Sequence, residues 1–212
     1  MKDILNFLIE VGKLKKMPRR GWVLRGIKNP ETIAAHTFRM TIMSWVLCCK
    51  KRLNLNKVLK MCLIHDLCEV CAGDTTPYDS MLSKDKKQWK KIFDKWPRLS
   101  KKKKEELFLK KNRKERDGLK KLIVNLPPNT KKEIYNLWDD YEKGLTPEGK
   151  FVRQLDRAEN LLQALEYWKK EKKFAIGPWW IQIEELIDDP ILLKFMEALD
   201  KKFHSDHGNE KS

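Results

Sequence analysis

The apolar residues of this chain recur every three or four positions along most of its length, which is the spacing of an amphipathic helix. Residues 4–14 form the first apolar stripe. The next segment, residues 16–28, is rich in proline, glycine and arginine and predicts a loop. A second helix is expected from about residue 29 to about residue 52, because Asn29-Pro30-Glu31 combines a capping side chain, a first-turn proline and an early acid.

The third predicted helix begins at a cap on Asn54 or Asn56 and ends at Gly73. It is apolar nearly all round, which predicts that it is buried. Further helical patterns fill the second half of the chain, at residues 83–126 with a break at Pro97, 129–143, 146–170, and from about Pro178 and Pro190 onward. Because no stretch alternates apolar and polar residues and no repeat is visible, we expect an all-α fold.

The chain has 212 residues, of which 41% are apolar, enough for one domain with a buried core. Its net charge is +16, but residues 81–121 hold 18 basic and 6 acidic side chains, a net of +12. The rest of the chain carries only +4. A near-neutral body with one basic segment does not have the charge distribution of a dedicated nucleic-acid-binding protein.

Nothing in the sequence indicates export or a membrane. Asp3 and Glu10 interrupt the first apolar stripe, so it does not form the core of a signal peptide, and no apolar run is long enough to span a bilayer. The five cysteines are an odd number and do not resemble a disulfide framework. We therefore expect a soluble, cytoplasmic protein with reduced thiols.

The third predicted helix contains the most unusual polar residues. His65 and Asp66 follow a full turn of apolar residues, and burial of an ionised Asp beside a His is costly unless a partner satisfies both. Glu69 shares their helix face, and Asp74 follows just past the glycine that ends the helix. A metal would offset the cost, although a purely structural His–Asp pair explains this helix equally well.

Two other predicted helices offer comparable side chains. His36 lies on the core-facing stripe of the second helix, and Asp156 lies beside the apolar residues of the helix that begins at Thr146. Taken singly, His36 could be a core histidine bonded to a carbonyl, and Asp156 could be an ion pair with its arginine neighbours. Taken together, they form a mixed imidazole and carboxylate set, which suits Mn, Fe, Co, Ni or Zn better than Mg or Ca.

A second possible metal site involves the cysteines around His65. Cys62, His65, Cys68 and Cys71 are spaced by three residues, but such a spacing turns each side chain progressively around a helix. They cannot all converge on one ion, so we expect buried thiols rather than a zinc site.

The order H…HD…D resembles the HD-domain phosphohydrolases. The longer strings PRRGWVLRGIKNPETIAAH, HDLCEVCAGDTTP, IYNLWDDYE and FVRQLDRAENLLQALEYW look like those of the HD-domain 5′-deoxynucleotidases, over most of residues 1–170. The resemblance implies an HD-domain helical bundle around one divalent transition metal, usually in a homodimer. It also implies a set of metal ligands, namely His36, His65, Asp66 and Asp156.

The same resemblance implies roles for four further residues. Glu69 would orient or deprotonate the attacking water, and Asp74 would contact the sugar or assist the leaving group. Arg19 would hold the phosphate, and Trp22 would lie against the sugar and base. A metal that lowers the pKa of water, together with an arginine fork for phosphate, is consistent with hydrolysis of a phosphate ester.

One segment departs from the family pattern. The connector at about residues 81–109 is longer than usual and contains four consecutive lysines, Lys101–Lys104. We expect a solvated, Lys-rich helical insertion in a single domain spanning residues 1–212, followed by a polar tail at about residues 204–212. A platform for nucleic acid or another polyanion is the alternative.

The sequence therefore predicts a metal-dependent phosphohydrolase, and the resemblance points to hydrolysis of deoxynucleoside 5′-monophosphates to deoxynucleosides and phosphate. Two other functions stay open. One is hydrolysis of another small nucleotide or phosphate ester by the same site. The other is a binding protein that keeps the metal pocket and uses the basic insertion on nucleic acid.

Overall fold

The computed structural model describes residues 1–49, 51–76, 100–171 and 176–204, together with Asp79, Leu82, Trp89 and Phe174. Over these residues the chain is helical and contains no strand, as the sequence predicts. Its elements are α1 (Lys2–Val11), the short 3₁₀ helix η1 (Gly12–Lys16), α2 (Arg20–Leu24), α3 (Ile33–Cys48), α4 (Leu55–Ile64), α5 (Glu69–Ala72), α7 (Lys101–Ile123), α8 (Pro128–Lys143), α9 (Pro147–Glu171), α10 (Gly177–Glu184) and α11 (Pro190–His204).

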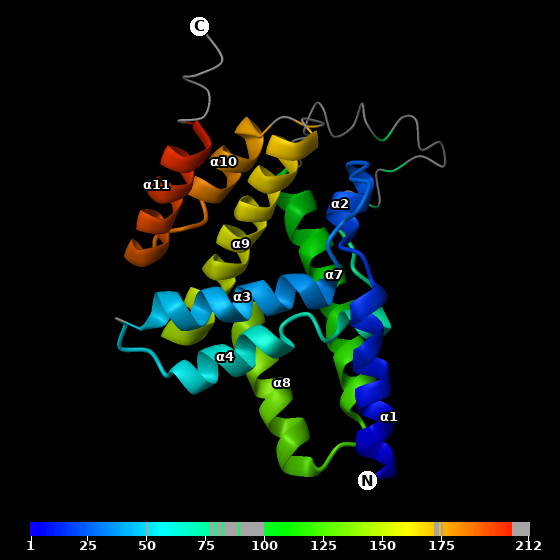
Figure 1. Ribbon diagram of the computed structural model, residues 1–212. Helices are drawn as coiled ribbons and strands as arrows, with labels where there is room; N and C mark the ends of the chain where they lie inside the picture. Colours follow the sequence, from blue (N-terminus) through cyan, green and yellow to red (C-terminus); the bar gives the residue numbers. More distant parts are fainter. Residues whose placement is uncertain are drawn as a thin grey trace, which may run out of the picture.

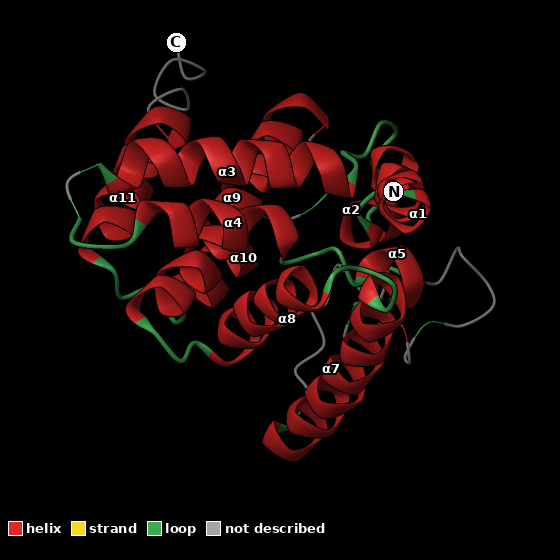
Figure 2. Ribbon diagram, turned by 90° about the horizontal axis from the view of Figure 1, so that it is seen from below, coloured by secondary structure: helices red, strands yellow, loops and turns green. Residues whose placement is uncertain are grey.

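Helix α9 is the central element of the bundle. Helices α3, α4, α8, α10 and α11 all pack against it, and Figure 1 shows α3 and α4 side by side near the N-terminal end of α9. Helix α7 packs on α5, α8 and α1 at the other side, and extends beyond the rest of the bundle in Figure 2. None of the described helices has the length and apolar content needed to cross a membrane.

Two hydrophobic clusters hold this arrangement together. The larger joins α3, α4, α9 and α11 through fully buried side chains such as Met40, Met61, Leu155 and Leu192. The second joins α7 and α8 to the N-terminal segment and includes the fully buried Trp138. Because α9 is buried over much of its length, polar residues on it are held in fixed positions inside the molecule.

The N-terminal half differs from the sequence prediction in where its helices begin and end. The predicted loop over residues 16–28 contains the five-residue helix α2. Helix α3 starts at Ile33, not near Asn29, because the Thr32 side chain caps it by accepting a hydrogen bond from the backbone N–H of Ala35 at 3.2 Å. It ends at Cys48, four residues before the predicted end.

The third predicted helix is broken into two. Asn54 caps α4, which ends at Ile64, and α5 begins only at Glu69. Between them, the backbone bonds change to the tighter i→i−3 pattern, as in the bond from Glu69 N–H to the Asp66 carbonyl at 3.1 Å. The prediction of one continuous helix through His65 and Asp66 is therefore wrong, and both residues lie in the turn between two helices.

The C-terminal half follows the prediction closely. Gly144 ends α8 in the left-handed conformation, with φ of 60°, and α9 begins at Pro147 as expected. Most of the predicted insertion lies outside the described residues. Its described end, residues 100–109, forms the capped start of α7. The predicted tail also lies outside the described residues, except for His204 at the end of α11.

Candidate metal centre

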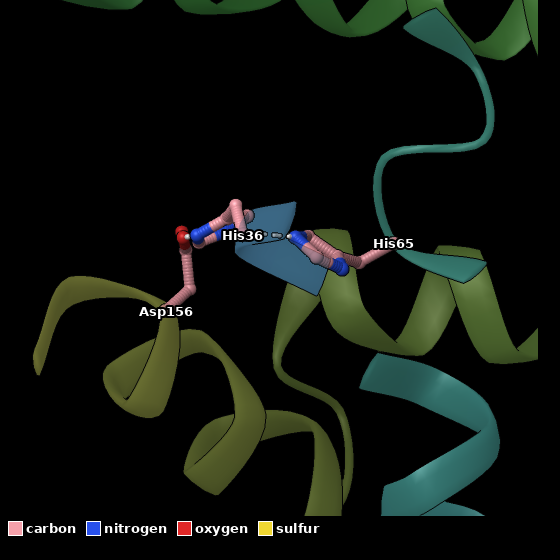
Figure 3. Close-up of side chains that lie close together, drawn as sticks. All are labelled: His36, His65 and Asp156. Carbon is pink, nitrogen blue, oxygen red and sulfur yellow. Dashed lines mark hydrogen bonds and ion pairs between the residues drawn. The ribbon is translucent and has the colours of Figure 1, made fainter. Parts of the chain in front are cut away.

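Three side chains from three separate elements converge at the centre of the bundle. His36 comes from α3, His65 from the turn after α4, and Asp156 from α9 (Figure 3). The His36 Nε2 atom lies 3.3 Å from His65 Nε2 and 3.3 Å from Asp156 Oδ1. One potential ligand atom of each residue lies within 4.8 Å of those of the others, and all three residues are buried.

Asp66 lies at the edge of this group. Its Oδ2 atom is 3.1 Å from His65 Nε2 and 4.0 Å from His36 Nε2. The same oxygen accepts a hydrogen bond from Arg19 NH1 at 2.8 Å, so Asp66 links the histidines to the loop before α2. The structure thus brings together all four side chains that the resemblance names as ligands, with three in a tight cluster and Asp66 shared with Arg19.

Each cluster residue is held by a neighbour. Asp156 accepts hydrogen bonds from Tyr141 Oη at 3.1 Å and from Asn160 Nδ2 at 2.8 Å. The His65 Nδ1 atom lies 2.7 Å from the Cys62 carbonyl oxygen, a bond that requires the proton on Nδ1. The opposite ring nitrogen, Nε2, points into the cluster.

The electrostatics of the cluster favour positive charge. Burial and the nearby Arg19 both oppose a proton on His36, but hydrogen bonds to Asp156 and Glu159 outweigh them and raise its pKa to about 9. Burial also opposes ionisation of Asp156, yet His36 and the surrounding cations hold its pKa well below the ordinary value. A divalent cation bound between these groups would balance the same negative charge.

The donor set fits such a cation. Two imidazole nitrogens and carboxylate oxygens form the ligand combination typical of Mn, Fe, Co, Ni or Zn sites. Within the described part of the chain, the buried Oε2 atom of Glu69 has no hydrogen-bond partner. A buried carboxylate oxygen without a hydrogen-bond partner is expected where a water, an ion or a substrate supplies the missing contact.

Comparison with known families agrees with this geometry. A model of the HD domain family matches residues 11–183, which include all four of these side chains. The chain belongs to the HD-domain family.

Several curated relatives of this HD-domain chain are named 5′-deoxynucleotidases. The 5′-deoxynucleotidase HDDC2 of Xenopus laevis is 37% identical over 172 residues, which cover 81% of this chain and 73% of the relative. The human protein of the same name is 36% identical over 172 residues, covering 81% and 72%. The Danio rerio protein of that name is 31% identical over the whole of this chain and 94% of its own length.

Solved structures share the same HD-domain architecture. A conserved hypothetical protein from Pyrococcus furiosus superposes with a TM-score of 0.67 and 25% identity, over 93% of this chain and 99% of that chain. A predicted metal-dependent phosphohydrolase from Magnetospirillum magnetotacticum superposes with a TM-score of 0.64 over 96% and 95% of the two chains. At 24% identity, this second likeness shows the fold alone.

Glu69 and Asp74, which follow the HD pair, lie close enough to Arg19 for both carboxylates to act on its charge. Burial and the charges of Asp66 and Asp74 raise the pKa of Glu69 well above its usual value. Asp74 is partly buried, and its Oδ2 atom accepts a hydrogen bond from the backbone N–H of Arg20 at 2.6 Å. This bond ties the segment after α5 to the start of α2.

The segment containing α2 supplies Arg19 and Trp22, and these two side chains lie in different surroundings. Arg19 borders the metal cluster, where NH1 bonds to Asp66 and NH2 donates to Asn160 Oδ1 at 2.9 Å. Trp22 is only 2% exposed and stacks on Trp179 with ring centroids 5.1 Å apart. Its Nε1 donates to Glu31 Oε1 at 2.9 Å. Arg19 therefore belongs to the polar cluster, while Trp22 belongs to an aromatic cluster next to it.

Sequence reasoning did not find Asn160, Tyr141 and Glu159, which surround the centre. Asn160 and Glu159 follow Asp156 by four and three residues, so helical spacing alone places them on its face of α9. That spacing could have identified both as neighbours of the site. Tyr141 lies on α8, and no local pattern connects it with Asp156.

Proposed function

We propose that this chain is a metal-dependent HD-domain 5′-deoxynucleotidase, which hydrolyses deoxynucleoside 5′-monophosphates to deoxynucleosides and phosphate. The observation that carries the proposal is the convergence of His36, His65 and Asp156, with Arg19 and Glu69 beside them. The relatives named 5′-deoxynucleotidases, which match most of the chain, support this substrate class.

In this proposal His36, His65, Asp66 and Asp156 hold one divalent transition metal, which is Mn, Fe, Co, Ni or Zn. When bound, such an ion lowers the pKa of water and polarises a phosphoryl oxygen. The remaining functions fall to side chains. Mixed nitrogen and oxygen ligands support a transition metal over Mg or Ca, but they do not select one of the five.

Glu69 is proposed to position the attacking water and to accept its proton. Hydrolysis forms a bond from the water oxygen to phosphorus and breaks the bond from phosphorus to the 5′ oxygen, which then takes up a proton. A buried carboxylate with a raised pKa accepts a proton near neutral pH more readily than an exposed one. Asp74, tied to the backbone of Arg20, is proposed to contact the sugar or assist the leaving group.

Arg19 is proposed to bind the phosphate. Its bonds to Asp66 and Asn160 hold the guanidinium at the edge of the metal cluster, and the group has further N–H donors besides these two. Asp66 and Asp156 raise the pKa of Arg19 further, against the effect of burial, so the charge is fixed. A permanent planar cation at this place suits a phosphoryl group.

The decisive experiment is a phosphate-release assay on purified protein with dAMP, AMP and dATP, in the presence of each of the five metals. We expect hydrolysis of dAMP to exceed that of both AMP and dATP. Equal rates on dAMP and AMP would contradict the deoxynucleotidase assignment and leave a broader phosphohydrolase. Assembly as a homodimer and a cytoplasmic location stay predictions, and light scattering of the purified chain tests the first.

A further inference from the structure

We propose that Glu159, held by Arg39, is a positioning residue that directs the Nε2 atom of His36 toward the metal and thereby sets the affinity of the centre for its ion. The inference deepens the proposed function and rests on it in one respect, namely that His36 is a metal ligand.

The first support is the hydrogen bond between Glu159 and His36. Glu159 has no solvent exposure, and its Oε2 atom lies 2.5 Å from His36 Nδ1. A carboxylate at that distance fixes a proton on Nδ1. The opposite ring nitrogen, Nε2, is the one that faces His65 and Asp156. One contact therefore determines both the orientation of the ring and which nitrogen is free to bind an ion.

Arg39 holds Glu159 in the position that this contact needs. Its Nε atom donates to Glu159 Oε1 at 2.7 Å, while NH2 donates to Gln163 at 2.6 Å and NH1 to Glu166 at 2.7 Å. The three acceptors lie on one face of α9, and Arg39 lies one turn after His36 on α3. The guanidinium thus clamps the two helices and supplies a counter-charge for a carboxylate that would otherwise be buried alone.

The two histidines of the centre are supported differently. His65 has its Nδ1 atom at 2.7 Å from the carbonyl oxygen of Cys62, a neutral acceptor one turn back in its own segment. His36 instead depends on a charged acceptor from another helix. A carboxylate acceptor increases the basicity of an imidazole and so strengthens it as a metal ligand. We therefore expect the loss of Glu159 to weaken metal binding more than the loss of an uncharged hydrogen-bond acceptor would.

A second ion is the competing explanation, because Glu31, His36 and Glu159 also have potential ligand atoms within 4.8 Å of one another. Two ligand atoms that share a tetrahedral transition metal lie about 3.4 Å apart, given bonds of about 2.1 Å. The 2.5 Å between His36 and Glu159 is a hydrogen-bond distance instead. Glu31 Oε1 already accepts a hydrogen bond from Trp22. The geometry therefore points to one ion bound by His36, with Glu159 as a buried hydrogen-bond partner of that histidine.

The test measures zinc affinity of the purified full-length chain by competition with a chromophoric chelator. We expect Glu159→Ala to raise the zinc Kd by about 10–100-fold, which is the usual effect of losing such a partner. Glu159→Gln should raise it less, because the amide oxygen still accepts the hydrogen bond without the charge. Gln163→Ala is the matched control, since it removes another Arg39 partner on α9 without touching His36. Its Kd should match the wild type.

A second measurement covers the case in which Glu159→Ala does not fold. Nitrogen NMR of the zinc-loaded wild type should place the His36 proton on Nδ1 and zinc on Nε2. A proton on Nε2 would overturn the inference, as would two zinc ions per chain or a folded Glu159→Ala variant with wild-type affinity. Neither readout involves a substrate. Zinc binding as expected without nucleotide hydrolysis would contradict the proposed function alone, whereas a chain that binds none of the five metals contradicts both.

Discussion

The Nε2 atoms of His36 and His65 face each other at 3.3 Å, although the two residues come from different helical segments. Both rings turn their Nδ1 atoms outward, His36 to Glu159 and His65 to the Cys62 carbonyl. Two ring nitrogens at this separation need a proton or a cation between them, because two lone pairs would repel one another. With Asp156 Oδ1 beside them, the arrangement favours positive charge, which the raised pKa of His36 provides as a proton and which a divalent metal would provide when bound.

Removal of a ligand should therefore remove the metal. We expect His65→Ala and Asp66→Ala each to lose both the bound transition metal and phosphatase activity, whereas the wild type holds about one ion per chain. Asp139→Ala is the matched control, since this carboxylate pairs with Lys143 on the surface of α8. Elemental analysis of the purified variants measures the outcome. Equal metal content in all of them would mean that the ligand assignment is wrong.

Glu69 should behave differently from the ligands. It is buried and near Asp66 and Asp74, but is proposed to act on water rather than on the metal. We expect Glu69→Gln to keep the metal and to lose turnover by a factor of about 10²–10⁴, as is typical of a lost general base. Metal analysis and kcat, measured on the same preparation, separate the two effects. A variant without metal would show that Glu69 is itself a ligand.

The position of Glu69 depends on a close contact between α5 and α7. A side-chain carbon on Gly118 would lie 2.9 Å from the Cys68 carbonyl oxygen and 3.1 Å from the Ala72 nitrogen, and both of these are backbone atoms. We expect Gly118→Ala to lower the free energy of unfolding by about 1–3 kcal/mol, because one of the two helices must shift. The shift should also reduce activity.

Gly12→Ala is the control for this prediction. Gly12 has an ordinary helical backbone, with φ of −57°, and no atom lies within 4 Å of the added carbon. We expect unchanged or slightly higher stability for this variant, since alanine restricts the unfolded chain. Urea denaturation of the two variants provides the comparison. If Gly118→Ala were as stable as Gly12→Ala, the contact between α5 and α7 would not be tight in solution.

The sequence predicted the helical class because apolar spacing is a local signal, whereas the set of four metal ligands came from the resemblance to the HD-domain family. Apolar spacing marks helices, and His65 and Asp66 were conspicuous within an apolar run. It did not predict that the chain tightens into a turn at these two residues, because their surroundings are apolar enough to continue a helix. Propensity favoured the helix, and the tertiary site overrode it.

The support around the centre was harder to predict than the centre itself. Arg39 and Glu159 have ordinary sequence neighbours, and each alone resembles a surface residue that would form a solvated ion pair. Their importance follows from the packing of α3 on α9, which buries Glu159 completely. No spacing rule connects residues on different helices, so only the tertiary structure identifies this pair.

Arg19 should affect all monophosphate substrates equally. It lies beside Asp66 and Asn160, where a phosphate group common to every nucleotide would bind. We expect Arg19→Ala to reduce kcat/KM for dAMP and AMP by the same factor, and Arg19→Lys to recover little, because lysine lacks the planar fork. Steady-state kinetics on both substrates provide the measurement. A loss confined to one nucleotide would instead place Arg19 near the sugar or base.

The resemblance implies that Trp22 lies against the sugar, so we expect this residue to determine the preference for deoxy over ribo substrates. A flat wall at C2′ leaves a ribose hydroxyl without space or a partner, which penalises AMP. Because Trp22 stacks on Trp179 and is nearly buried, alanine would cost about 3–5 kcal/mol of stability. Trp22→Phe is therefore the better test, since it keeps a ring and removes part of the wall.

We expect Trp22→Phe to narrow the ratio of kcat/KM for dAMP over AMP, mainly by raising the rate on AMP. Trp138→Phe makes the same change at a fully buried tryptophan of the cluster that joins α7 and α8 to the N-terminal segment, and its ratio should stay at the wild-type value. A lower ratio in both variants would reflect general loosening of the fold. If the wild-type ratio is high and Trp22→Phe leaves it unchanged, the deoxynucleotidase assignment stands but Trp22 is not the origin of the selectivity. Another part of the pocket would then exclude the ribose hydroxyl.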